Sequence, residues 1–300
     1  MSRRFAPPPH ASSEELKRAR DVAEELFKEQ RREEGPRAFE AVCAEVEREV
    51  RHALEVTDDL LGLTGGTLRE DPLLFQMLRN FCGPPISEED LWTLVGGPKF
   101  KRVPDAYADE TAEVISLVID SVRFPWVRAS RRPTVTERDM AILATTTLVA
   151  ARVLATNRRG SASVRQEHEV AAILAASGFT LDESRSAIQV LDDLNRGHFS
   201  RERVIGQAKC DVPVRLRDGR LLALECKVSN GPKNGWKRVN REVGGKAESW
   251  RQHFGSQIIT AVVLAGVFDL SCLVAAQESQ HVALFWEHSL DRLSEFLGSS

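Results

Sequence analysis

The sequence predicts a mixed α/β protein of the α+β kind, in which a mainly helical first half precedes a second half of helices and strands. Apolar residues recur at helical spacing from Ser13 onward. In the second half, two strand-like runs flank the hairpin signal at residues 217–220. The order helix, hairpin strands, helix, strands suits a sheet packed against helices rather than a helical bundle.

The first half contains several helical patterns and no catalytic signature. Residues 1–12 are expected to form a flexible arm, and a helix from Ser13 is expected to end at Gly35-Pro36. Ser87 opens a capping-box-like run, as in helices that begin with Ser and carry an acid three residues later. Further helices are predicted at residues 39–54, 72–81 and 106–122 and after Thr136. We therefore predict a mainly helical region at 1–160, which serves DNA recognition or dimerisation.

The second half, 161–300, is predicted to form a separate domain. Ser163 is expected to cap a helix that Gly178 closes. An amphipathic segment follows the hairpin at residues 236–254, and strands are predicted at 258–267 and 281–288.

Composition places the chain among ordinary globular proteins. It is 42% hydrophobic and 28% charged, which excludes collagen-like, disordered and disulfide-scaffold classes. The formal net charge of −3 does not indicate a nucleic-acid partner, so any such partner must be inferred from local charge.

Cysteine usage and hydropathy predict a soluble, cytoplasmic protein without a membrane partner. The five cysteines form no Cys-x-x-Cys pair and the seven histidines show no ligand spacing, which argues against zinc and against a disulfide framework. Residues 1–10 lack the apolar core of a secretory signal, and the apolar run 258–268 is too short to span a bilayer.

The informative chemistry lies in the hairpin. Glu225 and Lys227 point to one side of an otherwise apolar strand, because successive strand side chains alternate. Buried charges are costly unless they are used, paired or bound to metal. A plain Glu–Lys ion pair is the structural alternative.

The hairpin register provides a test of this interpretation. A two-residue loop would place Asp211 opposite Cys226, on the wrong face. A type I turn with left-handed Gly219 in a G1 bulge instead sets Asp211 opposite Glu225. Two facing carboxylates favour a divalent cation, and oxygen ligands favour Mg²⁺ or Mn²⁺ over zinc. Such a metal with a nearby lysine predicts phosphodiester hydrolysis.

These residues resemble the PD-(D/E)xK nuclease superfamily, with Cys210 at the position usually held by Pro. The residues that follow resemble the XamI-type restriction endonuclease family over roughly 161–300. The matching positions are Glu225-Cys226-Lys227-Val228-Ser229-Asn230, Asn234, Lys237-Arg238, Arg241-Glu242, Lys246-Ala247, Trp250, Phe254-Gly255, Ala265-Gly266-Val267-Phe268, Ala276-Gln277, Phe285-Trp286-Glu287-His288 and Leu290. Gly231 and Gly235 stand where members often have Ser, which leaves the loop beside the site in doubt.

The resemblance implies a restriction-endonuclease-like αβββαβ core and a type II endonuclease that cuts double-stranded DNA at a short specific site with Mg²⁺. Its candidate catalytic residues are Asp211, Glu225, Lys227 and the accessory Glu167, and its candidate metal ligands are Asp211, Glu225 and Cys226. A surface carboxylate is the alternative for Glu167, and the Cys226 side chain is expected in the core. A cognate DNA methyltransferase would protect the host, and symmetric cutting would favour a homodimer.

Local charge supports DNA contact. Residues 227–251 hold seven basic and two acidic side chains, a local charge of +5. An apolar stripe is expected on one side of this segment, at Trp236, Val239, Val243, Ala247, Trp250 and Phe254. The candidate DNA-binding residues are Ser229, Asn230, Lys233, Asn234, Lys237, Arg238 and Arg241. A solvated helix face is the alternative.

Two other functions remain open at this point. One is a different PD-(D/E)xK nuclease, acting in repair, junction resolution or phage defence. The other is a DNA-binding protein whose nuclease core is inactive. His198, His253 and His288 are interpreted as structural or DNA-adjacent residues rather than general bases.

Overall fold

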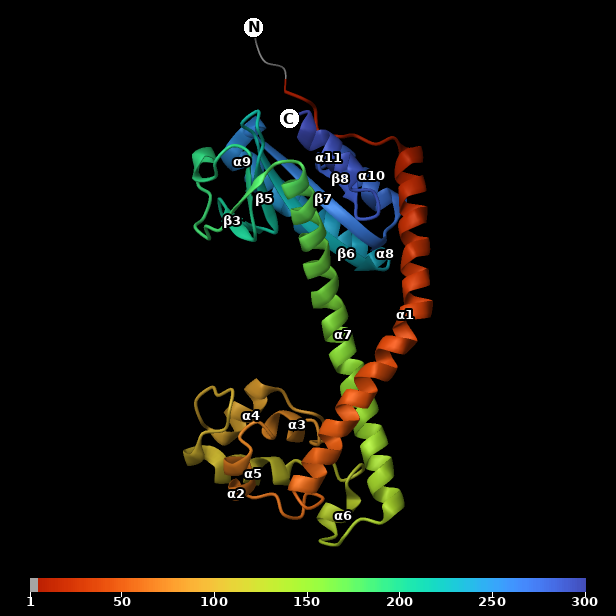
Figure 1. Ribbon diagram of the computed structural model, residues 1–300, viewed down its shortest axis with the longest axis vertical. Helices are drawn as coiled ribbons and strands as arrows, with labels where there is room; N and C mark the ends of the chain where they lie inside the picture. Colours follow the sequence, from red (N-terminus) through yellow and green to blue (C-terminus); the bar gives the residue numbers. More distant parts are fainter. Residues whose placement is uncertain (1–4) are drawn as a thin grey trace. The chain divides into compact units, whose positions relative to one another are not determined.

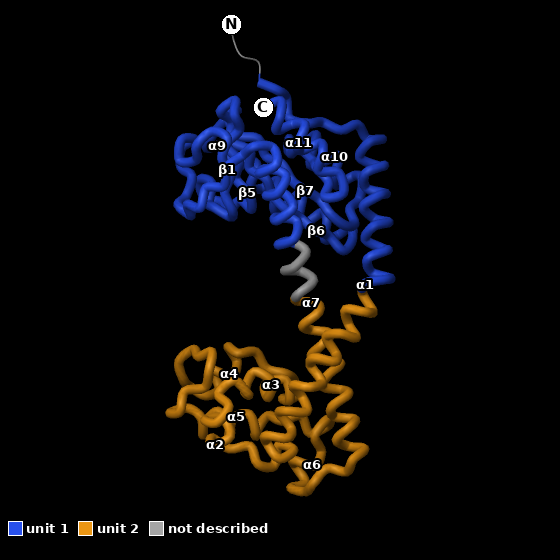
Figure 2. The backbone as a smooth tube through the Cα atoms, in the orientation of Figure 1, with its two compact units in different colours: residues 1–34, 158–300 blue, residues 35–157 orange. Residues whose placement is uncertain are grey.

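The computed structural model describes residues 5–300, except for the side chains of residues 157–162. The chain forms two compact units, one made of residues 1–34 and 158–300 and the other of 35–157 (Figure 2). The predicted division at 1–160 and 161–300 therefore differs from the observed grouping, because residues 1–34 join the C-terminal unit. Helices α1 (Ser13–Val56) and α7 (Val135–Ala176) contribute residues to both units.

The unit of residues 35–157 is helical around one apolar core. Between α1 and α7 it contains short helices, and its core includes stacked Phe81 and Phe124 with Trp126 edge-on to Phe124. Ser87 and Asp90 form the predicted capping box at the start of α4. The short helices are α2 (Gly65–Glu70), α3 (Phe75–Leu78), α4 (Glu88–Val95), η1 (Asp105–Tyr107), α5 (Ala108–Leu117) and α6 (Pro125–Arg128).

Two predicted helix boundaries are wrong. Helix α1 continues through Gly35-Pro36, because a proline removes only one helical hydrogen bond and apolar residues are buried both before and after it. Helix α7 likewise continues through Ser163, whose hydroxyl donates to Glu167 Oε1 at 3.0 Å instead of capping a new helix. The predicted stop at Gly178 is confirmed by its φ of +78°.

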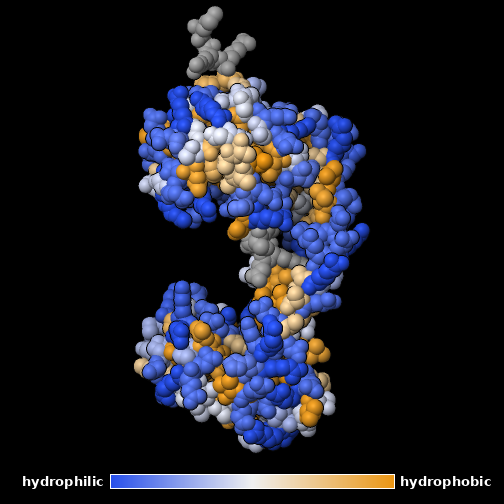
Figure 3. Space-filling view, viewed as in Figure 1, coloured by the Kyte–Doolittle hydropathy of each residue, from blue (hydrophilic) through white to orange (hydrophobic). Residues whose placement is uncertain are grey.

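Within α7, residues Val135–Thr156 have the length and apolar composition of a membrane span, and a third of this window is buried. The buried residues include Ala141, Ile142, Val149 and Ala150, which belong to the core of the helical unit. Figure 3 shows mostly hydrophilic surface on both units in that view. One side of this helix therefore belongs to the core of the unit, while Met140 and Leu143 on it are exposed.

The other unit is built on a six-stranded mixed sheet with the order β1-β2-β5-β6-β7-β8. Figure 1 labels β5, β6, β7 and β8 of this sheet. Strand β5 runs antiparallel to β2 and β6, while β1, β7 and β8 run parallel to the strands beside them. A two-stranded sheet, β3-β4, lies apart from it in the hydrogen-bonding order. The strands are β1 (Thr180–Asp182), β2 (His198–Ser200), β3 (Arg203–Ile205), β4 (Ala208–Cys210), β5 (Val212–Arg215), β6 (Leu221–Asn230), β7 (Ile258–Val267) and β8 (Ala283–Trp286).

Helices cover both faces of the large sheet. The end of α7 and α11 (Asp291–Gly298) pack on the face that carries Leu222 and Leu224. The opposite face is covered by the π-helical turn η3 (Lys237–Val243), α9 (Gly244–Phe254), α10 (Leu270–Glu278) and the first part of α1. Helix α8 (Pro232–Trp236) connects β6 to η3. The remaining short turns are η2 (Leu191–Asp193) and η4 (Gly255–Gln257). The α+β prediction is confirmed, and α7-β2-β5-β6-α9-β7 supplies the αβββαβ order.

Residues 5–12 are held against the C-terminal unit, so the predicted flexible arm is wrong for this part. The Gln277 side-chain amide accepts a hydrogen bond from the Ala11 N–H at 2.9 Å and donates one to its carbonyl at 2.8 Å. Further along, Leu16 and Ala23 are buried in the core formed with η3 and α10. The Gln277 side-chain amide therefore pairs with both backbone groups of Ala11, as the backbone of a neighbouring strand would. Residues 1–4 lie outside the described chain.

Candidate active site

The hairpin between β5 and β6 has the predicted register. The Leu216 N–H donates to the Arg220 carbonyl at 2.9 Å, and the Gly219 N–H donates to the Leu216 carbonyl at 3.0 Å. Gly219 has a φ of +101°, which a residue with a side chain rarely adopts. The ladder pairs Val212 with Leu224, so its next step sets Asp211 opposite Glu225.

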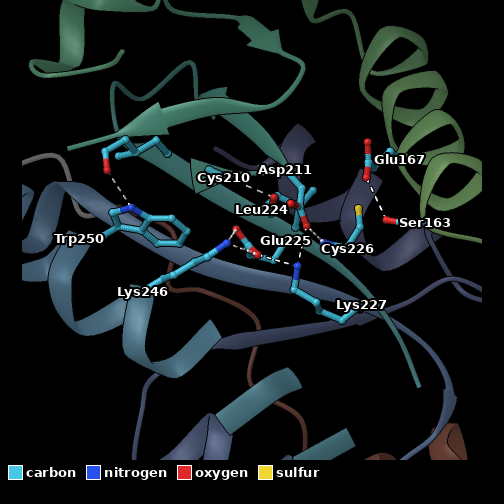
Figure 4. Close-up of polar contacts among 11 residues, drawn as sticks. Ser163, Glu167, Cys210, Asp211, Leu224, Glu225, Cys226, Lys227, Lys246 and Trp250 are labelled. Atoms are coloured by element: carbon cyan, nitrogen blue, oxygen red, sulfur yellow. Dashed lines mark hydrogen bonds and ion pairs between the residues drawn. The ribbon is translucent and has the colours of Figure 1, made fainter. Parts of the chain in front are cut away.

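Asp211 lies just before β5, where its carboxylate reaches across to β6 (Figure 4). Its Oδ2 accepts hydrogen bonds from the Cys226 N–H and from Lys227 Nζ, each at 2.8 Å. The backbone bond fixes the carboxylate at the edge of the strand. This confirms that Asp211 shares a face with the ammonium of Lys227.

Glu225 is the most deeply buried charged group of this site, with 0% of its side chain exposed. Lys227 Nζ lies 2.7 Å from its Oε2, and Lys246 Nζ lies 2.9 Å from Oε1 and 2.8 Å from Oε2. Two ammonium groups therefore face two carboxylates. A buried carboxylate without such partners would cost several kcal/mol.

The charge of Lys227 is favoured by this arrangement. Burial alone would lower the pKa of its ammonium, but the adjacent Glu225 and Asp211 carboxylates outweigh that effect and raise the pKa. Lys227 therefore stays protonated between the two carboxylates.

Lys246 is the member of the site that sequence reasoning missed. Lys246 lies on α9, 21 residues after Glu225 in the sequence, and its side chain reaches back to the Glu225 carboxylate. The sequence feature that could have identified Lys246 is its position in the amphipathic segment, directly before buried Ala247 and four residues before buried Trp250. A lysine beside an apolar stripe points toward the sheet edge, but the partner it meets there depends on tertiary packing.

Glu167 and Cys226 lie toward the other face of the sheet. Burial raises the pKa of the Glu167 carboxyl, and the nearby Asp211 carboxylate adds to that rise. The Cys226 side chain is 3% exposed and packs in the core under α7, and burial raises the pKa of its thiol. The Cys226 thiol is thus a core group, and only its main chain faces Asp211.

One edge of β6 is free beside these residues. Strand β6 pairs with β7 along all ten of its residues, from Leu221 to Asn230, but its pairing with β5 stops at Leu224. Within the described part of the chain, no strand pairs with this edge beyond Leu224. Asp211, Glu225 and Lys227 therefore gather where two paired strands separate.

Comparison with known proteins identifies the family. The family model described as XamI restriction endonuclease matches residues 58–286. The chain belongs to this family. The Type II restriction enzyme XamI of Xanthomonas campestris pv. amaranthicola is 37% identical over 190 residues, which cover 61% of this chain and 68% of that enzyme. No solved structure matches.

Family membership makes the chain a restriction-type DNA endonuclease. The matched region includes most of the helical unit as well as the hairpin, so the resemblance extends well before residue 161. It also contains the converging Asp211, Glu225 and Lys227, together with Lys246.

The predicted DNA-contacting residues of this restriction endonuclease differ in exposure. Lys233, Lys237 and Arg241 are exposed and Arg238 is half-buried, while the stripe residues Val239, Val243, Ala247 and Trp250 are buried on the opposite side. Asn230 is exposed and Asn234 is half-buried. Ser229 is fully buried and its hydroxyl donates to the Gly231 carbonyl at 2.9 Å, so it braces the turn and is not presented to solvent. Trp236 is 45% exposed, which contradicts its predicted place in the apolar stripe.

The three histidines show no general-base geometry at the carboxylates. His253 contacts the Gln189 carbonyl at 2.9 Å, and His198 contacts the Arg196 carbonyl at 3.1 Å. Burial lowers the pKa of His288.

The five cysteines are free thiols.

Proposed function

We propose that this chain hydrolyses phosphodiester bonds of double-stranded DNA at a short specific site, in a Mg²⁺-dependent reaction that also accepts Mn²⁺. One observation supports the proposal most strongly. Carboxylates from opposite sides of a hairpin, Asp211 and Glu225, converge on a single cationic group, Lys227 Nζ, at 2.8 and 2.7 Å.

The donor set fits a hard divalent cation. Both groups that converge are carboxylates, which Mg²⁺ and Mn²⁺ prefer, and one ammonium, that of Lys227, already lies within 2.8 Å of an oxygen of each. Among the described residues, no group of three or more His, Cys, Asp and Glu side chains converges. We therefore assign Asp211 and Glu225 as the metal-holding side chains, with Cys226 contributing at most through its main-chain carbonyl.

Different side chains of the site would have different roles in hydrolysis. Bound Mg²⁺ would supply Lewis acidity toward a phosphoryl oxygen and toward a water. Lys227 places a protonated ammonium beside the carboxylates, where it can balance the charge that develops on the phosphate. Glu167 holds a half-buried carboxyl on α7 that lies close enough to Asp211 and Lys227 to interact with their charges, so it can orient a water beside Asp211.

DNA would be held by the exposed basic residues that follow β6. Lys233, Lys237, Arg238 and Arg241 have no ion-pair partner within the described chain, which leaves their charge available to phosphates. In sequence, Asn230 lies between Glu225 and this basic segment, and Asn234 lies within the segment. We further infer that the enzyme acts in the cytoplasm as a homodimer, paired with a DNA methyltransferase that protects the host. The helical unit serves DNA recognition or dimerisation in this proposal.

Asp211→Asn provides the cleanest test of the centre. The substitution keeps the side chain's size and leaves Lys227 paired with Glu225, so the fold should persist. Plasmid cleavage in Mg²⁺ should fall at least about 100-fold, while duplex binding measured without metal should change by less than about threefold. Lys209→Met is a matched control, because its ammonium pairs only with exposed Glu202. Cleavage by Asp211→Asn at the wild-type rate would refute the assignment.

A further inference from the structure

Glu225 has two ammonium partners with different geometry. Lys227 extends from the same strand and contacts both carboxylates, Asp211 and Glu225. Lys246 comes from α9 and, of the two carboxylates, contacts only Glu225, through both Glu225 oxygens. The two lysines approach from different elements, so one can move without the other.

The packing of α9 fixes the position of Lys246. Its ammonium lies 5.9 Å from the ring centre of Trp250, which is fully buried and donates from Nε1 to the Ile205 carbonyl at 3.0 Å. A Cβ at Gly244 would lie 2.3 Å from the Gln280 side chain, so this glycine lets the helix pack closely there. Gln280 in turn donates to the Asn240 carbonyl at 2.9 Å. These contacts fix the part of α9 from which the Lys246 side chain reaches Glu225.

A cation bound between Asp211 and Glu225 would take the place that Lys227 Nζ now has. Lys227 would then lose its contact with Glu225 Oε2, whereas Lys246 also contacts Oε1, for which Lys227 does not compete, and that contact would remain. Without Lys246, a fully buried carboxylate would have no protein partner to orient it toward the cation.

We propose that Lys246 is a positioning residue, which holds Glu225 from α9 so that Lys227 is free to leave the carboxylates and face the scissile phosphate. This inference rests on the proposed function. Lys246 acts through Glu225 and does not itself touch the substrate. Partners that orient a metal-binding side chain typically contribute 10–100-fold to metal affinity or activity.

Whether loss of Lys246 weakens or tightens metal binding distinguishes a positioning role from a purely electrostatic effect of its charge. Removing a positive charge close to a metal site should by itself tighten cation binding. Losing the orientation of Glu225 should weaken it. The test is therefore the affinity of Mn²⁺ alone for the whole protein without DNA, measured by calorimetry for Lys246→Met and Lys246→Arg.

We expect Lys246→Met to weaken Mn²⁺ binding by about 10-fold or more, and Lys246→Arg to stay within a few-fold of wild type. In a Glu225→Gln background, Lys246→Met should cause no further loss, because the group it acts through is gone. Lys209→Met should bind Mn²⁺ as wild type does. If Lys246→Met does not fold, Lys246→Gln replaces it, with the same expectation.

Unchanged or tighter Mn²⁺ binding by the folded Lys246 variants would overturn the inference, as would an equal loss in the Glu225→Gln background. Different results would contradict the proposed function itself. If wild-type protein binds no Mn²⁺, or if Asp211→Asn leaves its binding intact, the metal centre itself is wrong. If Asp211→Asn abolishes binding while Lys246→Met preserves it, only the role of Lys246 is wrong.

Discussion

The basic residues of η3 should give the enzyme a measurable part of its DNA affinity. Lys237 and Arg241 are exposed and Arg238 is half-buried, while Val239 and Val243 on the same turn are fully buried. The triple substitution of Lys237, Arg238 and Arg241 by Ala therefore removes three surface charges and leaves the apolar anchor intact. DNA affinity should fall, and its salt dependence should become shallower.

The magnitude follows from counterion release. Each phosphate neutralised by the protein contributes about 0.9 to the slope of log affinity against log salt concentration, so three contacts contribute about 2.7. Over a fourfold increase in salt, from about 50 to 200 mM, wild type should lose about 40-fold more affinity than the triple variant. This difference is large enough to separate full engagement of the three residues from engagement of one.

Fluorescence anisotropy with a labelled duplex, measured without divalent metal, gives the slope in the absence of cleavage. The control is the triple substitution of Lys28, Arg51 and Arg292 by Ala, which changes the net charge equally but removes cations that Glu24, Glu25, Glu47 and Glu15 already pair. Its slope should match wild type. A wild-type slope for the η3 variant, or an equally reduced slope for the control, would show that this surface does not contact the DNA backbone.

Three further predictions concern stability. Gly219→Ala should destabilise the C-terminal unit by about 1–3 kcal/mol in chemical denaturation, because the φ of +101° is strained for any side chain, and an unchanged midpoint would contradict this. Gln277→Ala should make residues 5–12 sensitive to limited proteolysis, since it removes both hydrogen bonds to Ala11; continued protection would mean that other contacts hold the segment. Burial lowers the pKa of His288, so folding should lose stability as pH falls below the ordinary histidine value of about 6.5 and through the depressed one. His288→Asn should make that decline shallower, and identical pH profiles would argue against the effect.

Local rules were sufficient to predict the hairpin. Side chains alternate along a strand, and the turn chemistry of Asp218-Gly219 selects one register, so the meeting of Asp211 with Glu225 could be derived from about fifteen residues of sequence. The strand at 258–267 was predicted with its observed bounds for a similar reason, because a continuous apolar run of that length is typical of a buried strand.

Features decided by tertiary packing were not predictable in this way. Pro36 normally ends a helix, yet α1 continues because its two parts are buried in separate cores. Trp236 falls on the apolar stripe of an ideal α-helix, but η3 is a π-helical turn, which changes the residue spacing and shifts the buried face between Trp236 and Val239. Lys246 depends on where α9 crosses the sheet. Each of these outcomes needs the position of a second element.

The set of charges around Glu225 also bears on the plain ion-pair alternative. A structural Glu–Lys pair requires one carboxylate and one ammonium, and apolar residues of the same size often stabilise a core as well or better. Here a second carboxylate, Asp211, shares the ammonium of Lys227, and a second ammonium, Lys246, shares the carboxylate of Glu225. Each additional charge adds a desolvation cost that a structural pair does not need. Such an excess is typical of sites where charge is required for chemistry. The arrangement therefore favours a functional centre over a structural ion pair.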